Sequence, residues 1–230
     1  MIIAVANTKG GTGKTTTAVQ LALYRQSLGH EVWLVDGDEQ QSALTAVSIR
    51  SENNVKPALA CSAYSDARTL KSQIETQVNK WEDIIIDVGG RDTGALRAAL
   101  LVCDILLVPV QPRSYDVWAL SKLEDIIRDA RDIGADFDAY CFLSCADSQG
   151  ADNQEAAEVM KQCEEMRFLD KAIGRRKAFA TAGGAGLSVF ELRPKDAKAC
   201  SELKALADAI YRSEERRVGK ECRSRWSPYH

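Results

Sequence analysis

The stretch Thr8-Lys9-Gly10-Gly11-Thr12-Gly13-Lys14-Thr15-Thr16 decides the fold of this 230-residue chain. An apolar run at residues 2–6 precedes it, and a segment with apolar residues at helical spacing follows it. Strand, glycine loop and helix in this order are the setting of a phosphate-binding loop. Glycines let successive backbone N–H groups turn toward a polyphosphate, and the helix N-terminus adds partial positive charge. We therefore expect a nucleotide site here.

The residues of the loop have predicted roles in binding a nucleoside triphosphate. Lys14 can reach the β- and γ-phosphate oxygens, and the Thr15 hydroxyl can ligate Mg²⁺. Backbone groups of the loop would hold the remaining phosphate oxygens. The expected nucleotide-binding residues are Lys9, Gly10, Gly11, Thr12, Gly13, Lys14, Thr15 and Thr16.

The loop departs from the standard pattern G-x-x-x-x-G-K-[ST] at its first glycine. Thr8 occupies that position, and Lys9-Gly10-Gly11 follows it. In this the loop resembles the deviant Walker A motif of the ParA/MinD superfamily, whose early lysine acts across an ATP-bound dimer. The resemblance implies a catalytic role for Lys9 at the nucleotide of the other subunit, where an additional cation would spread the charge of the transition state.

Carboxylates follow two further apolar runs. Residues 31–35 lead to Asp36 and Asp38, and a second hydrophobic strand ends in Asp87. Ligands bind at the carboxyl edge of open α/β sheets, so these side chains should lie beside the phosphate loop. The two segments resemble the second motif and the Walker B strand of the same superfamily. By this resemblance Asp38 orients the attacking water, while Asp36 and Asp87 join Thr15 in holding Mg²⁺.

Two positions differ from the superfamily pattern in the predicted switch regions. Glu39 stands where relatives usually carry proline, which is expected to loosen the first switch and to slow or retune hydrolysis. Gly89-Gly90 stand where many relatives carry prolines, and they imply a looser hinge. Glycine backbone N–H groups can approach a γ-phosphate closely, so we expect Gly89 to contact the nucleotide and its loop to relax when that phosphate is lost.

The alternation of strand-like and helix-like segments predicts a three-layer α/β fold of the P-loop NTPase type. Its central sheet should be mostly parallel, with helices on both faces. We assign residues 1–212 to one ATPase domain, and we interpret residues 213–230, which lack apolar periodicity, as a non-native or disordered tail. Gly183-Gly184-Ala185-Gly186 is expected to be a flexible turn. Later strands are expected at residues 58–61, 104–110 and 140–145, and later helices at residues 66–80, 95–102, 117–133, 153–166 and 196–211.

Composition limits the partners that the chain can have. An apolar content of 45% suits one two-sided core, and a net charge of −3 excludes a general nucleic-acid coat. Any DNA contact must therefore be local, and Arg175-Arg176-Lys177 is the candidate, with a solvated turn as the alternative. No apolar run is long enough to cross a bilayer and no signal peptide is apparent, so we expect a cytoplasmic protein without a membrane partner.

The resemblance implies a ParA-type ATPase that uses ATP and Mg²⁺. Such an ATPase dimerises on ATP, binds DNA non-specifically on the nucleoid, and segregates plasmid or chromosome DNA with a centromere-binding ParB-like partner that stimulates hydrolysis. One alternative is a MinD-like ATPase that acts on a membrane, and another is the same machine with a conjugative or cell-envelope cargo. An iron–sulfur ATPase would need paired cysteines at a dimer interface, and the seven scattered cysteines supply no such pair.

Overall fold

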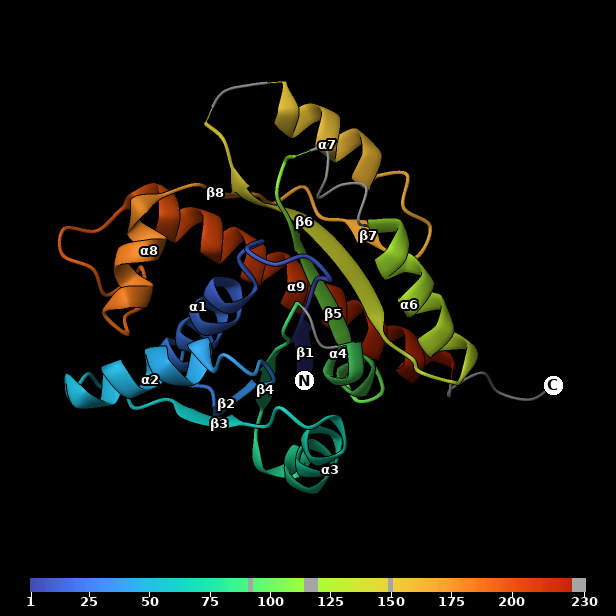
Figure 1. The fold of residues 1–230 in the computed structure, drawn as a ribbon, viewed down its shortest axis with the longest axis horizontal. Helices are drawn as coiled ribbons and strands as arrows, with labels where there is room; N and C mark the ends of the chain where they lie inside the picture. The colour runs from blue at the N-terminus through green and yellow to red at the C-terminus, as the bar shows by residue number, and fades with distance from the viewer. Residues whose placement is uncertain (91–92, 114–119, 149–150, 225–230) are drawn as a thin grey trace.

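A parallel β-sheet forms the centre of the molecule (Figure 1). The computed structural model describes residues 1–90, 93–113, 120–148 and 151–224. The strands among these residues are β1 (Ile2–Val5), β2 (Val32–Asp36), β3 (Ala60–Ala63), β4 (Asp83–Asp87), β5 (Ile105–Val110), β6 (Asp138–Ala146), β7 (Arg167–Phe168) and β8 (Ile173–Gly174). They lie in the order β3-β2-β4-β1-β5-β6-β7, with β8 also paired to β6. Every neighbouring pair is parallel.

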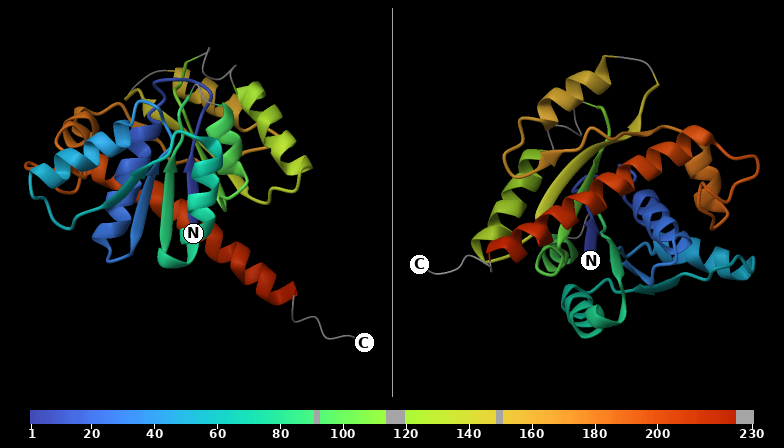
Figure 2. Two further views of the ribbon diagram at one scale, coloured as in Figure 1. Left: turned by 60° about the horizontal axis from the view of Figure 1, so that its bottom comes forward. Right: turned by 180° about the vertical axis from the view of Figure 1, so that it is seen from behind.

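Helices cover both faces of this sheet (Figures 1 and 2). One face is packed by α1 (Lys14–Ser27), α2 (Ser42–Glu52), α8 (Lys177–Gly184) and α9 (Ala197–Ser224). The other face is packed by α3 (Ala67–Gln77), α4 (Thr93–Leu100), α6 (Leu120–Asp132) and α7 (Asp152–Met160), and the short 3₁₀ helix η1 (Val78–Lys80) follows α3. The predicted three-layer, parallel α/β fold is confirmed.

The first strand shows why the central strands are continuous apolar runs. Successive side chains of a strand point to opposite faces of the sheet. Ile3 and Val5 therefore join the core beneath α1, whereas Ile2 and Ala4 join the core on the opposite face. A strand with helices on both sides has no solvated face, so its sequence shows no polar alternation.

The strand register brings the predicted site together. β1 lies between β4 and β5, so the loop that follows it opens near the middle of the carboxyl edge. Asp87 pairs in register with Val5 on one side and with Asp36 on the other. Both carboxylates therefore leave the sheet at the level where the phosphate loop begins.

Helix α8 was not predicted, and it corrects the interpretation of the glycine-rich stretch as a flexible turn. Gly183 and Gly184 are the last two residues of this helix. A glycine inside a helix costs up to ~1 kcal/mol. The helix forms nevertheless, because Phe179 and Ala182 are buried in the core shared with α1 and α2. The turn begins only at Ala185.

Other boundaries also differ from the sequence-based expectation. The helix expected at residues 153–166 ends at Met160, and β7 follows it. The first residues expected for α6, 117–119, lie outside the described part of the chain. The last helix continues to Ser224 instead of ending near Tyr211, in line with the many Arg, Glu and Lys residues of segment 212–224, which are good helix formers. The assignment of residues 213–230 to a non-native or disordered tail stays a prediction.

Candidate nucleotide and magnesium site

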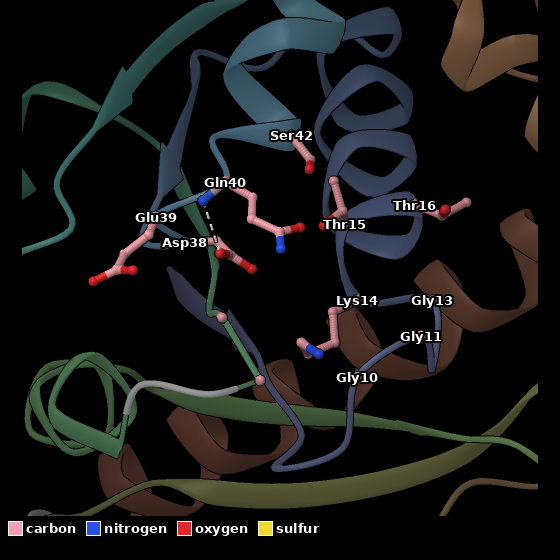
Figure 3. A pocket seen from close by; sticks show the side chains of 12 residues that line it. Gly10, Gly11, Gly13, Lys14, Thr15, Thr16, Asp38, Glu39, Gln40 and Ser42 are labelled. Carbon is pink, nitrogen blue, oxygen red and sulfur yellow. Dashed lines mark hydrogen bonds between the residues drawn. The ribbon is translucent and has the colours of Figure 1, made fainter.

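A cavity of about 780 Å³ opens at the carboxyl edge of the sheet, where the phosphate loop meets the loops after β2 and β4 (Figure 3). In Figure 3 the side chains of Lys14, Asp38 and Gln40 point into the space in front of α1, whereas Glu39 points away from it. The cavity is lined by Gly10, Gly11, Gly13, Lys14, Thr15, Thr16, Asp38, Glu39, Gln40, Ser42, Gly89 and Gly90. Most of the predicted nucleotide contacts therefore border one space.

The phosphate loop depends on glycine at the residue before α1. Gly13 has a φ of 91°, and a Cβ there would lie 2.6 Å from Ser144 Oγ. Any other L-residue would be strained in its backbone, and its Cβ would displace the Ser144 hydroxyl. Gly13 is also the N-cap of α1, where no side chain caps the helix and no acidic residue lies in the first turn. The first N–H groups of the helix are thus left for an anionic ligand.

Lys14 is held beside the loop in a position from which it can turn to a phosphate. Its side chain is buried, and its Nζ donates a hydrogen bond to Lys9 O at 2.9 Å. Burial lowers the pKa of Lys14, and the negative charges of Asp87 and Asp38 oppose that change. A Cβ on Gly90 would lie 3.0 Å from Lys14 Nζ, so a glycine there leaves the ammonium free to move. The side chain of Lys9 itself is exposed.

Asp36 organises the loop after β2. Its Oδ1 accepts a hydrogen bond from Asp38 N at 3.0 Å, and its Oδ2 accepts one from Leu44 N at 2.9 Å. Burial raises the pKa of Asp36 although these backbone N–H groups act against the rise. Asp36 is fully buried and does not line the cavity. Its contacts fix the turn that carries Asp38 into the cavity, and its place in the Mg²⁺ shell stays a prediction.

Asp38 faces the loop after β4. A Cβ on Gly89 would lie 3.0 Å from Asp38 Cγ, so any larger residue there would push this carboxylate from its position. Its Oδ1 accepts a hydrogen bond from Gln40 N at 3.0 Å, which closes the turn that contains Glu39. The acidic side chain and the glycine turn therefore lie next to each other in the lining of the cavity.

Asp87 is a buried carboxylate next to the first turn of α1. It is 1% exposed, and neither of its oxygens has a hydrogen-bond partner of standard geometry among the described residues. Burial raises the pKa of Asp87 to about 7, which the neighbouring Thr15 hydroxyl and Lys14 ammonium oppose only in part. A buried anion of this kind is costly unless a cation satisfies it. These two oxygens fit a site for Mg²⁺, reached directly or through water.

The residues present therefore fit a Mg²⁺–triphosphate. Bound Mg²⁺ would bridge phosphate oxygens and neutralise charge that develops during phosphoryl transfer. Asp87 and the Thr15 hydroxyl could hold the ion and its water shell. The loop N–H groups and Lys14 could hold the phosphates.

The buried Asp87 carboxyl predicts a pH dependence of stability in the Mg²⁺-free protein. Its pKa rises from 3.8 to about 7 on folding, so between these values the folded state keeps a proton that the unfolded state has lost. The contribution of this carboxyl to the free energy of unfolding is complete below pH ~4 and decreases as the pH rises toward 7. Asp87→Asn is expected to raise the free energy of unfolding at pH 8 by on the order of 3 kcal/mol, and to change it little at pH 4.

Urea unfolding of both proteins at pH 4 and pH 8 measures this difference. Asp170→Asn, which alters an exposed aspartate, is the matched control and should give the same difference from wild type at both pH values. An Asp87→Asn variant that gains no stability at pH 8 would contradict the assignment.

The basic triplet lies at the end of β8, away from the cavity lining. Arg175 Nε lies 3.5 Å from Asp147 Oδ1, and Arg176 forms a bidentate pair with Glu202. The hydrogen bond with Glu202 raises the pKa of Arg176. Lys177 begins α8. Two of the three cations therefore have carboxylate neighbours within the chain, and their contact with DNA stays a prediction.

Sequence reasoning missed several residues at this site. Gln40 and Ser42 line the cavity, Ser144 lies against Gly13, and Gln111 donates to Gly11 O. Gln111 follows β5 directly, and a polar residue at the carboxyl end of a strand beside β1 was a usable signal. Ser144 precedes an irregularity in the pairing of β6 that no sequence pattern indicates.

Comparison with known proteins agrees with this geometry. The model of a family described as the CobQ/CobB/MinD/ParA nucleotide binding domain matches residues 3–189. The chain is 26% identical over 209 residues to the maintenance of carboxysome distribution protein A of Halothiobacillus neapolitanus, covering 90% of this chain and 95% of that protein.

Solved structures share the fold. A putative plasmid partition protein from Borrelia burgdorferi bound to AMPPNP superposes with a TM-score of 0.72 and 17% identity, covering 92% of this chain and 98% of that one. The septum site-determining protein MinD from Pyrococcus horikoshii, complexed with Mg-ADP, gives a TM-score of 0.70 and 18% identity, covering 91% and 95%. Among the described residues, no helix has the length and apolar character needed to cross a membrane.

Proposed function

The chain belongs to the CobQ/CobB/MinD/ParA family of nucleotide-binding domains, in which it is a positioning ATPase that uses ATP and Mg²⁺, and we propose that its cargo is DNA. In this proposal ATP closes a homodimer that binds DNA non-specifically on the nucleoid. A centromere-binding ParB-like protein then stimulates hydrolysis and release. The observation that supports a nucleotide-driven switch is the cavity in which Lys14, Asp38 and the Gly89-Gly90 turn meet.

Lys14, Asp38 and Gly89 have different roles in hydrolysis. Lys14 leaves Lys9 O and places its ammonium on the phosphates, so that negative charge is balanced where it develops. Asp38 accepts a hydrogen bond from the attacking water and orients it for in-line attack. Gly89 allows the loop after β4 to approach Asp38 closely, so loss of the γ-phosphate changes contacts in both loops together.

Lys9 supports the dimer part of the proposal. Its side chain is exposed at the mouth of the phosphate loop, and its backbone N–H is fixed by Asn7 Oδ1 at 2.9 Å. A lysine whose backbone is fixed and whose side chain is exposed can reach the nucleotide of a second copy. A cation at that point would favour both dimer closure and the transition state.

The beginning of α8 supports the DNA part of the proposal. Lys177 is the first residue of this helix, and no acidic residue lies in its first turn. A lysine at a helix N-terminus is unfavourable by itself, because it faces the positive end of the helix dipole. A phosphate at this position would be stabilised by both the helix N-terminus and the lysine. Two copies in a dimer would double the number of phosphate contacts.

Filter binding to random-sequence DNA in the presence of ATP, ADP or no nucleotide tests the DNA proposal. Wild-type protein is expected to bind with ATP and to bind at least ~10-fold more weakly in the other two states. Lys177→Ala should weaken binding and reduce the salt dependence, expressed as the slope of log K against log salt, by about 1 per subunit.

Lys204→Ala is the matched control, because Lys204 is an exposed lysine paired with Asp208 on α9. It should leave DNA affinity within twofold of wild type. Equal affinity in all three nucleotide states would reject the ATP-dependent switch, and no binding in any state would reject DNA as the cargo.

A second candidate cargo is a protein assembly. It is favoured by the similarity to the carboxysome distribution protein, which extends over 90% of this chain. A MinD-like role on membranes is the third candidate. Co-sedimentation with anionic liposomes in the presence of ATP would detect the membrane role, which the DNA proposal excludes.

A further inference from the structure

Gln111 holds the phosphate loop from outside the cavity. Its Nε2 donates a hydrogen bond to Gly11 O at 2.5 Å, across 100 residues of sequence. We propose that Gln111 is a positioning residue for ATP binding, which fixes the Gly11–Thr12 peptide with its N–H toward the phosphates, and that Arg175 orients the Gln111 amide.

The first step of the argument is the planarity of the peptide. The Gly11 C=O and the Thr12 N–H belong to one trans peptide unit, so they point in opposite directions. A phosphate loop works only when its N–H groups face the ligand and its carbonyls face away. Holding Gly11 O from the side of β5 therefore aims Thr12 N–H away from β5.

The glycines themselves do not fix this orientation. A Cβ on Gly10 or on Gly11 would meet no heavy atom within 4 Å, and Gly11 has a φ of 77°. Glycine enters positive and negative φ with similar ease, so Gly11 itself does not fix the orientation of the peptide that follows it. A flipped peptide would turn a carbonyl toward the phosphates, and the hydrogen bond from Gln111 opposes that flip.

Gln111 is the anchor that remains available when ATP binds. Lys9 O is held by Lys14 Nζ at 2.9 Å, a bond that is lost when the lysine moves to the phosphates. At the start of the loop, Asn7 is buried, its Oδ1 accepts from Lys9 N, and its Nδ2 donates to Pro109 O at 2.8 Å. The end of β5 thus holds the loop at two points, through Pro109 and through Gln111.

Arg175 determines which way the Gln111 amide faces. Its Nη2 lies 3.5 Å from Gln111 Oε1, and its Nε lies 3.5 Å from Asp147 Oδ1. Both distances are long for hydrogen bonds. These contacts therefore set the orientation of the Gln111 amide but contribute little binding energy. A reversed amide would place its oxygen against Gly11 O and its NH₂ against the guanidinium, and both contacts would be repulsive. The cation therefore selects the orientation that donates to the loop.

The test is the steady-state kinetics of Gln111→Met, which keeps the length of the side chain and removes the donor. KM for ATP is expected to rise roughly five- to tenfold, whereas kcat stays within twofold of wild type, because one positioned hydrogen bond is lost and the reacting groups are unchanged. Equilibrium binding of a fluorescent ATP analogue should weaken by the same factor. Gln26→Met is the matched control, because Gln26 Nε2 donates to a backbone carbonyl, Ala58 O at 2.6 Å, far from the site.

A second experiment tests the role of Arg175 in orienting the Gln111 amide. Arg175→Met is expected to raise KM about threefold in the wild-type background and to have no further effect in the Gln111→Met background, because it acts through the amide. A KM for Gln111→Met within twofold of wild type, or an equal effect of Arg175→Met in both backgrounds, would overturn the proposal. If ATP binds to the variants as to wild type and only DNA binding changes, Arg175 belongs to the DNA surface instead.

Discussion

Lys14→Ala is expected to reduce ATP turnover at least ~10³-fold, to background. Among the described residues that line the cavity, Lys14 alone carries a positive charge, while Asp38 and Glu39 are acidic. The substitution therefore leaves an excess of carboxylates facing a triphosphate. Lys14 is 7% exposed, so no solvated cation can take its place without reorganising the loop. Phosphate release at saturating ATP and Mg²⁺ measures the effect.

Lys9→Ala is the comparison variant for this experiment. Lys9 lies in the same loop but is exposed, so its removal should chiefly lower dimer assembly and turnover while sparing part of the ATP binding. Size-exclusion chromatography with ATP separates assembly from binding. A Lys14→Ala protein that keeps more than a tenth of wild-type turnover would contradict the assignment of Lys14 to the phosphates.

Glu191→Leu is expected to lower the free energy of unfolding by about 3–5 kcal/mol. Arg50 is 2% exposed, and Glu191 binds it through both oxygens at 2.8 Å. The remaining partners of the guanidinium are the carbonyls of Pro57 and Gly186. Without Glu191 a full positive charge is buried with no counter-ion. Urea denaturation at pH 7 measures the loss.

The double variant Arg50→Met/Glu191→Leu provides the sharper test of this pair. It removes both charges, so it should be more stable than Glu191→Leu alone. Glu158→Leu is the surface control, because Glu158 pairs with Lys161 in solvent and such pairs contribute ~0–1 kcal/mol. Equal losses in Glu191→Leu and Glu158→Leu would show that the Arg50 pair is not buried in solution.

The Arg50 pair also connects the first switch to the far end of the chain. α2 begins after the turn that Asp36 fixes, and its Arg50 binds Glu191 across 141 residues. Gln20 of α1 holds the same segment through Leu187 O and Val189 N at 2.8 Å. The turn after β2 and the segment that follows α8 are therefore linked through the two ends of α2.

The nucleotide loop, the strand ends that carry Asp36, Asp38 and Asp87, and the parallel three-layer fold could all be predicted from the sequence. Each depends on a local pattern of a few adjacent residues. A buried strand needs a continuous apolar run, a phosphate loop needs glycines before a lysine, and parallel strands place their carboxyl ends at one edge.

Only the tertiary structure decided which side chains hold that site in place. Gln111 donates to Gly11 O across 100 residues, and Arg50 binds Glu191 across 141. Ser144 packs against Gly13, although the two positions are far apart in sequence. Helix α8 forms because its apolar residues find a buried surface on α1 and α2, despite two glycines. Such contacts depend on distances between elements, and a local pattern of residues carries no information about those distances.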